Sequence, residues 1–221
     1  MSRVPLTADE LDAIVRQTQA HYADRAQAFR DGTRDHDVRQ NIDALLDHIV
    51  GTPPFTILDL GCGPGRDLAE LRRRGHRAVG LEGVPAFAAM ARGHSGCEVL
   101  EQDFLRLDLA PGHFDGIFAN ASLFHVPTQE LGRVLGELHA ALKEDGVLFS
   151  SNPRGDDVEG YSSGRYGVWH SFERWRDYLE RAGFDALLHY YRPPGLPRDQ
   201  QPWLASVWRK RASPGPASAG R

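Results

Sequence analysis

The sequence has little cysteine, little lysine and no long apolar stretch. Its two cysteines, Cys62 and Cys97, form neither a disulfide framework nor a paired metal-binding motif, and no metal site is expected. No apolar run approaches the ~18 residues that a membrane-spanning helix needs. The first residues lack the charged-then-apolar pattern of a secretory signal. We therefore expect reduced thiols, a cytoplasmic location and no contact with a membrane.

An excess of positive charge is also absent. The chain has 26 basic and 30 acidic residues and a formal net charge of −4. Such a chain is a poor electrostatic match for the phosphates of nucleic acid, so we expect no nucleic acid partner. The apolar fraction of 41% is ordinary for a globular protein. A chain of this length can bury roughly 70% of its surface, which is enough for one self-sufficient domain.

The first fifty residues have helical character. Thr7-Ala-Asp-Glu10 fits a capping box, and apolar residues at helical spacing follow it as far as Phe29. A second periodic stretch covers 38–49 and ends at Gly51, before Pro53-Pro54.

From residue 55 onward, short apolar runs alternate with helical ones. Strands are expected at 55–60, 77–81, 98–101, 114–119 and 146–151. Helices are expected at 67–74, 85–92 and 128–142. This alternation predicts a mostly parallel sheet with helices on both faces. The remainder is expected to be a polar loop, a helix and two last strands, at 152–167, 171–182, 184–191 and 203–208.

The strongest motif is the glycine-rich loop Asp59-Leu-Gly-Cys-Gly-Pro-Gly65, directly after the first expected strand. Its glycines let the backbone turn sharply and approach a ligand without interference from a Cβ atom. The helix that follows presents unpaired amides and a positive dipole end, which suit an anionic group. A dinucleotide loop would need a third glycine where Arg66 stands, which argues against a nicotinamide-dependent oxidoreductase.

On this loop and on the acids after the next two strands, the chain resembles the class I S-adenosylmethionine-dependent methyltransferases over residues 55–183. The resemblance implies an α/β fold with a Rossmann-like seven-stranded sheet whose last strand is antiparallel. It implies S-adenosyl-L-methionine as cofactor. The loop residues that would cradle the amino acid part of that cofactor are Asp59, Gly61, Cys62, Gly63 and Gly65.

Two acids follow the next strands. The resemblance implies that Glu82, followed by Gly83, accepts both ribose hydroxyls through charge-assisted hydrogen bonds. It implies that Asp103, followed by Phe104, reads the adenine amino group. Taken singly, each acid is explained equally well by the alternative that it is an ordinary solvated residue of a loop. Together they stand at the carboxyl ends of expected strands, where open α/β sheets bind ligands, and this favours a cofactor site.

The resemblance also assigns residues near the methyl group. Asn120 and Ala121 would line the methionine side of the cofactor, and Tyr22 would lie on a helix that closes over it. His125 is a candidate general base, because an ordinary histidine pKa near 6.5 suits proton acceptance near neutral pH. The alternative for His125 is a packing or loop-capping role.

Candidate contacts to the methyl acceptor come from outside the core, and they are Phe29, Arg165, Tyr166 and Tyr191. The alternatives are core packing for Phe29, a mobile surface loop for Arg165 and Tyr166, and a structural corner or interface for Tyr191.

These observations predict one methyltransferase domain over 1–211. Within it we expect a helical cap (1–51), a cofactor-binding core (55–151) and a substrate side (152–211), followed by a flexible tail (212–221). The expected reaction moves a methyl group to an oxygen, nitrogen or sulfur atom of a small molecule, mainly by in-line positioning. The acceptor stays open, as does the choice between monomer and homodimer. A methyltransferase-like binding or regulatory protein without turnover is the alternative.

Overall fold

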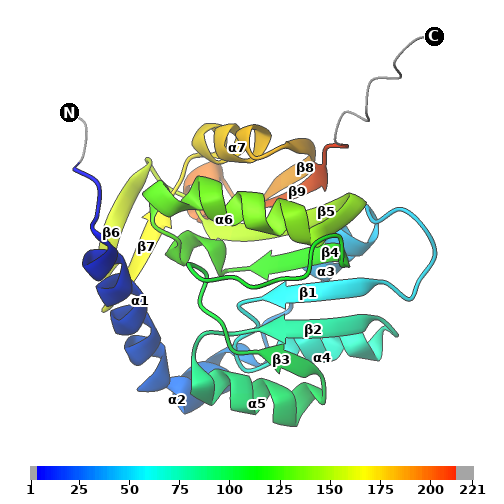
Figure 1. Ribbon diagram of the computed structural model, residues 1–221, viewed down its shortest axis with the longest axis horizontal. Helices are drawn as coiled ribbons and strands as arrows, with labels where there is room; N and C mark the ends of the chain where they lie inside the picture. The colour runs from blue at the N-terminus through cyan, green and yellow to red at the C-terminus, as the bar shows by residue number, and fades with distance from the viewer. Residues whose placement is uncertain (1–3, 213–221) are drawn as a thin grey trace.

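The computed structural model describes residues 4–212, and a seven-stranded sheet runs through its centre (Figure 1). The strands are β1 (Thr56–Leu60), β2 (Arg77–Leu81), β3 (Glu98–Leu100), β4 (Phe114–Asn120), β5 (Leu142–Pro153), β8 (Phe184–Arg192) and β9 (Trp203–Lys210). Their spatial order is β3, β2, β1, β4, β5, β9, β8. Strands β1 to β5 are parallel, and β9 is antiparallel to both of its neighbours. The expected fold class is confirmed. The tail expected at 212–221 lies, beyond residue 212, outside the described residues.

Helices cover both faces of the sheet. They are α3 (Arg39–Leu46), α4 (Arg66–Arg73), α5 (Pro85–Ser95), α6 (Thr128–Ala141) and α7 (Phe172–Arg181). Helices α6 and α7 pack on one face, and α3 and α4 pack on the other, with α5 beside α4. Successive strand residues serve opposite faces: Leu58 faces α6, whereas Ile57 and Phe118 face α3. This two-sided burial explains why the central strands are almost wholly apolar.

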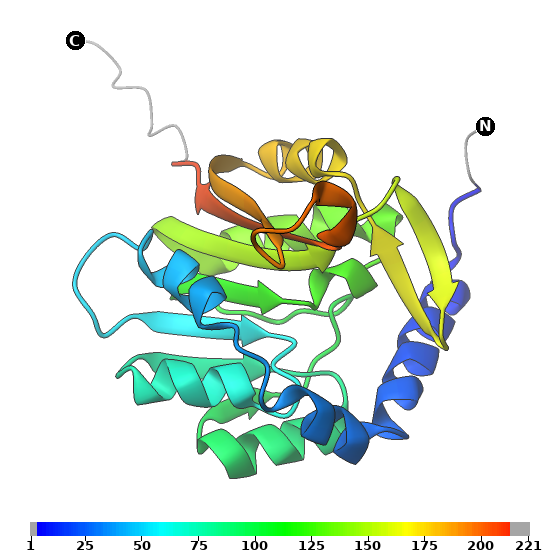
Figure 2. The same cartoon turned by 180° about the vertical axis from the view of Figure 1, so that it is seen from behind.

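The segment 152–167, expected to be a loop, forms most of a β-hairpin. Its strands are β6 (Val158–Ser162) and β7 (Arg165–Trp169), joined at Ser163 and Gly164, which both have positive φ. Of the glycines that suggested a loop, Gly160 and Gly167 lie within these strands, Gly164 lies at their turn, and Gly155 precedes them. Figure 2 shows the hairpin beside the amino-terminal helix, where Tyr166 and Val168 pack against Ile14.

The amino-terminal segment forms α1 (Ala8–Ala23) and α2 (Ala26–Thr33) before α3. The expected capping box is confirmed: Thr7 Oγ1 accepts from the Glu10 amide at 3.3 Å, and Glu10 Oε2 accepts from the Thr7 amide at 2.7 Å. The helical spacing through Phe29 suggested an unbroken helix, but the chain turns at Asp24 and Arg25. That turn lets α1 run along the hairpin while α2 crosses toward the glycine loop (Figure 1).

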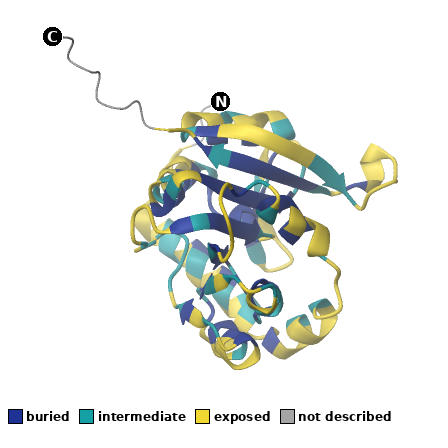
Figure 3. Ribbon diagram, turned by 90° about the vertical axis from the view of Figure 1, so that its right-hand side faces the viewer, coloured by how far each residue is buried: buried dark blue, intermediate teal, exposed yellow. Residues whose placement is uncertain are grey.

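The outer strand β8 is exposed along most of its length, whereas β9 beside it is largely buried (Figure 3). Within residues 4–212, none of the helices has both the length and the apolar character required to traverse a bilayer.

Two glycine substitutions should act in opposite directions. Gly65 has φ +90°, and a Cβ atom there would lie 2.6 Å from Ala91 Cα of α5. We expect Gly65→Ala to lower the free energy of unfolding by about 2–4 kcal/mol through backbone strain and overpacking. Gly132, inside α6, has nothing within 4 Å of such an atom. Gly132→Ala should therefore raise that free energy by about 0.5–1 kcal/mol. Urea denaturation followed by circular dichroism measures both, and equal effects would contradict this packing.

Candidate functional site

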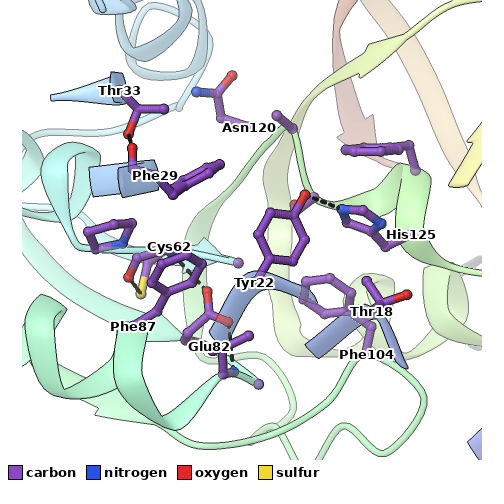
Figure 4. Close-up of a pocket in the computed structure, with 18 of the residues that line it drawn as sticks. Thr18, Tyr22, Phe29, Thr33, Cys62, Glu82, Phe87, Phe104, Asn120 and His125 are labelled. Carbon is purple, nitrogen blue, oxygen red and sulfur yellow. Dashed lines mark hydrogen bonds between the residues drawn. The ribbon is translucent and has the colours of Figure 1, made fainter. Parts of the chain in front are cut away.

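A cavity of about 570 Å³ opens at the carboxyl ends of the parallel strands. Its floor is formed by residues that directly follow β1, β2 and β3, and by the last residues of β4. Helices α1 and α2 close over it with Thr18, Tyr22 and Phe29 (Figure 4). This volume lies within the range that protein sites for small ligands usually have.

The glycine loop between β1 and α4 presents bare backbone to this cavity. The Gly61 and Cys62 amides donate to the Leu81 carbonyl at 2.8 and 3.1 Å, which fixes the loop against the end of β2. Gly63 has φ +53°, and a Cβ atom there would meet nothing nearer than the Phe29 ring, at 3.9 Å. A ligand can therefore approach the backbone closely at Gly63.

Glu82 lies buried at the end of β2 as a hydrogen-bond acceptor. Its Oε2 accepts from the Gly63 amide and its Oε1 from the Val84 amide, both at 2.9 Å. A carboxylate has about four lone-pair sites, so each oxygen can still accept one more donor. Burial raises the pKa of Glu82, and the nearby backbone amides of Val84, Gly63 and Gly83 oppose that rise.

Asp103 and Phe104 line the cavity on the side of α1. Asp103 Oδ1 accepts from the Leu105 amide at 2.8 Å, a local turn that holds the carboxylate in place. Its Oδ2 lies 3.5 Å from a nitrogen of Arg106. Asp103 is thus a fixed acceptor at the cavity wall, with part of its capacity used by its own loop.

His125 and Tyr22 form a hydrogen-bonded pair across the cavity. His125 Nδ1 lies 2.6 Å from the Tyr166 carbonyl, which can only accept, so Nδ1 carries the proton. Nε2 therefore accepts from the Tyr22 hydroxyl at 2.9 Å (Figure 4). Burial lowers the pKa of His125 to about 4; the Tyr166 carbonyl opposes this, and the charges of Arg165 and His21 add to it. His125 is therefore a neutral acceptor at neutral pH.

A chain of hydrogen-bonded polar side chains runs from the cavity wall at Arg66, Asp67 and Asn120 to Asn41 and Tyr190, and sequence reasoning did not predict these hydrogen bonds. Arg66 donates to both oxygens of Asp67, at 2.7 and 3.0 Å. Asn120 donates to Asp67 Oδ2 and accepts from Asn41, both at 3.0 Å, and Tyr190 donates to Asn41 at 2.8 Å. Four elements far apart in sequence supply these residues, so no local sequence motif predicts the network. The network fixes the orientation of the Asn120 side chain.

Most of the residues predicted from the sequence come together at this cavity. Those that line it are Tyr22, Phe29, Gly61, Cys62, Gly63, Glu82, Gly83, Asp103, Phe104, Asn120, Ala121, His125 and Arg165. This placement agrees with the expected site, while the role of each residue stays a prediction.

Four predicted residues do not line the cavity: Asp59, Gly65, Tyr166 and Tyr191. Asp59 is buried in β1, where desolvation and then the charge of Asp67 raise its pKa well above the usual value. Gly65 packs on α5. The Tyr166 ring packs beside Ile14, so this residue offers the site its carbonyl in place of its side chain.

Tyr191, the fourth, lies at the end of β8 under the guanidinium of Arg198, whose carbon is 3.2 Å from the ring centroid. Its ring is thus occupied by another side chain outside the cavity.

Lining residues that the sequence did not single out include Thr18, Gln19, Arg66, Asp67, Phe87, Ser122 and Trp203. Thr18 lies one helical turn before Tyr22, so extending the face of that helix would have found it. Ser122 Oγ is buried and has no hydrogen-bond partner among residues 4–212.

Comparison with known proteins gives a consistent result. Residues 57–146 match the family described as "Methyltransferase domain". The trans-aconitate 2-methyltransferase of Enterobacter sp. (strain 638) is 38% identical over 119 residues, which are 52% of this chain and 45% of that protein. The magnesium-protoporphyrin O-methyltransferase of Rhodobacter capsulatus is 30% identical over 152 residues, 67% of this chain and 61% of that protein. The chain thus spans less than two thirds of the length of these relatives.

Solved structures show the same fold. The 1,6-didemethyltoxoflavin-N1-methyltransferase of Burkholderia thailandensis has a TM-score of 0.76 at 24% identity, covering 96% of this chain and 94% of its own. A TehB-like SAM-dependent methyltransferase from Corynebacterium glutamicum has a TM-score of 0.66 at 22% identity, covering 87% and 99%.

The low pKa of His125 predicts a defined loss of stability in acid. Its pKa is about 4 in the folded chain against a usual 6.5, so only the unfolded chain takes up this proton between those values. Stability therefore falls as pH drops from 6.5 toward 4. We expect His125→Gln to reduce that fall by on the order of 2–3 kcal/mol. Urea denaturation at several pH values measures it, with the exposed His94→Gln as control. Parallel curves for all three proteins would contradict the assignment.

Proposed function

We propose that the chain is an S-adenosylmethionine-dependent methyltransferase that acts on a small-molecule acceptor, a proposal supported by the family match over residues 57–146 and by the similarity to known methyltransferases. The observation that carries the proposal is Glu82, a buried carboxylate at the end of β2 with one free acceptor site on each oxygen. A ribose diol presents two adjacent hydroxyl donors, which such a carboxylate can accept together.

The rest of the cavity fits the same cofactor. The bare backbone at Gly63 suits its amino acid part, and the unpartnered Ser122 Oγ offers a further polar contact near Gly61. Asp103 and Phe104 would hold the adenine. Asn120 and Ala121 would lie along the methionine side. When bound, the cofactor supplies a methyl group already activated on a sulfonium.

The protein then has to align the acceptor atom with the methyl group and the sulfur, and to exclude water from the site. Tyr22 packs edge-on against Phe29, with ring centroids 5.5 Å apart, and Phe29 lies 5.2 Å from Phe87. These rings close the cavity under α1 and α2. Tyr22 also offers an aromatic face to a cation, which suits a sulfonium centre.

An acceptor that arrives protonated needs a base, and we assign that role to His125 with Tyr22. The Nδ1–H group donates to the Tyr166 carbonyl, so Nε2 is the unprotonated nitrogen that can accept a proton. The Tyr22 hydroxyl can pass its proton to Nε2 as it receives one from the acceptor. An acceptor that is already deprotonated would need neither residue.

A small acceptor is supported by the cavity of about 570 Å³ and by the names of the relatives. These relatives are named for methylating trans-aconitate and magnesium-protoporphyrin. The proposed division of labour keeps residues 55–151 as the cofactor-binding core and 152–211 as the acceptor side. Of the cap expected at 1–51, α1 and α2 cover the cavity, whereas α3 packs on the sheet.

Calorimetry with S-adenosylhomocysteine, and with NAD as the rival ligand, tests the cofactor. Tritiated S-adenosylmethionine with a protein-free metabolite extract then tests transfer to a small molecule. We expect S-adenosylhomocysteine to bind and label to appear in the small-molecule fraction. Binding of NAD alone would favour an oxidoreductase, and cofactor binding without any transfer would favour a regulatory protein.

Removing the Glu82 carboxylate, the proposed acceptor for the ribose hydroxyls, should weaken cofactor binding. We expect Glu82→Ala to reduce the affinity for S-adenosylhomocysteine by about 1.5–3 kcal/mol, because charge-assisted hydrogen bonds are lost. Glu98→Ala, an exposed acid on β3, serves as the matched control and should leave affinity unchanged. Calorimetry on both variants, after circular dichroism has verified folding, measures the difference. Unchanged affinity in Glu82→Ala would overturn the ribose assignment.

A further inference from the structure

Three arginines line the cavity, and they differ in what their guanidinium groups contact. Arg66 is paired with both oxygens of Asp67. Arg192 donates to the Asp37 carbonyl at 3.2 Å. The guanidinium of Arg165 has no hydrogen bond and no ion pair to any residue in the described range 4–212, although the residue is half-buried, and it contacts the Tyr22 ring. A guanidinium carries five donors, and leaving them unmatched in a partly buried site is costly.

Arg165 lies next to the proposed base. Its guanidinium carbon is 5.7 Å from the centroid of the Tyr22 ring. The next residue in β7, Tyr166, supplies the carbonyl that orients His125. Two consecutive residues of the hairpin therefore supply the guanidinium beside Tyr22 and the carbonyl that orients His125.

We propose that Arg165 binds a carboxylate of the methyl acceptor and thereby holds the acceptor's nucleophilic atom against the Tyr22–His125 pair. This inference rests on the proposed function. A planar guanidinium offers two parallel N–H groups that match the two oxygens of a carboxylate.

The acids that line the cavity do not take this place. Glu82 is held by backbone amides and Asp103 by its own turn. Asp67 is paired with Arg66, and Asp37 is paired with Arg39.

The body of the acceptor is expected to be apolar. Apolar side chains that line the cavity include Val15 of α1, Phe124 and, from β9, Trp203. The Phe124 ring lies 3.9 Å from the His125 ring, centroid to centroid, so an apolar wall adjoins the base. An aromatic or other apolar monocarboxylate combines these two requirements.

Binding of such an acid would also strengthen the base. The groups that face His125 are Tyr22 and His21 on α1, Arg165 on β7 and the Tyr166 carbonyl. The positive charge of Arg165 is one cause of the low pKa of His125. A carboxylate on Arg165 offsets that charge, so His125 would accept a proton more readily once the acceptor is in place. The proton leaves the acceptor for Tyr22, whose own proton moves to Nε2.

The test uses the full chain saturated with S-adenosylhomocysteine and pairs of probes that differ only in charge. The pairs are benzoate with benzamide, and phenylacetate with phenylacetamide. We expect at least one carboxylate to bind tenfold or more tightly than its amide in calorimetry. Arg165→Gln should abolish that preference, whereas Arg192→Gln, at the same cavity, should keep it. Circular dichroism and S-adenosylhomocysteine binding verify that each variant is folded.

A second readout follows the His125 ring directly. In an NMR titration of the imidazole, a bound carboxylate should raise the apparent pKa of His125, and the matching amide should not. Arg165→Gln should raise this pKa without any probe and make it insensitive to carboxylate.

The outcomes separate the two proposals. Failure of S-adenosylhomocysteine to bind overturns the proposed function itself. Binding of S-adenosylhomocysteine with no carboxylate preference, or a preference lost in Arg192→Gln and kept in Arg165→Gln, overturns only the role of Arg165.

Discussion

The site depends on one buried carboxylate that joins two strand ends. Glu82 follows β2, and through the Gly63 amide it holds the loop that follows β1. The Leu81 carbonyl holds the start of the same loop through the Gly61 and Cys62 amides. A charge this deeply buried is tolerated because donors surround it. The arrangement that makes Glu82 a good acceptor for a ligand is therefore the one that shapes the glycine loop.

The cap is an integral part of the cavity, because it supplies both walls and chemistry. The α1 helix starts at the capping box of Thr7, packs on the hairpin and ends with Tyr22 over the cavity. Tyr22 then contacts His125, which β7 supports from behind. Segments far apart in the sequence thus complete the same hydrogen-bonded chain, so the base can form only when both are docked on the core.

The sequence predicted best what local patterns encode. A glycine loop and acids at strand ends can be read from neighbouring residues, and Gly63, Glu82 and Asp103 do meet at one cavity. The identity of a residue does not show whether its side chain or its backbone faces the site. Tyr166, a predicted contact to the acceptor, offers its carbonyl to His125, and Asp59, adjacent to the loop, is buried near Asp67 of α4 and does not line the cavity.

Contacts between segments far apart in the sequence were the other feature that the sequence could not predict. The hairpin at 158–169 looked like a loop because its glycines are typical turn residues, and its strands pair only with each other. The bonds from Asp67 through Asn120 and Asn41 to Tyr190 join four separate elements, which no spacing rule relates.

Charge is distributed unevenly along the cavity, and this asymmetry constrains what can occupy it. The carboxylates of Glu82 and Asp103 lie after β2 and β3, whereas Arg165 and the neutral His125 lie across the cavity on the hairpin side. Tyr22 stands between Glu82 and His125 (Figure 4). Burial weakens screening by solvent, so each end favours ligand groups of opposite polarity. Donor hydroxyls and a cationic centre suit the first end. An anion suits the second, where its charge would compensate Arg165 and let the adjoining imidazole act as a base.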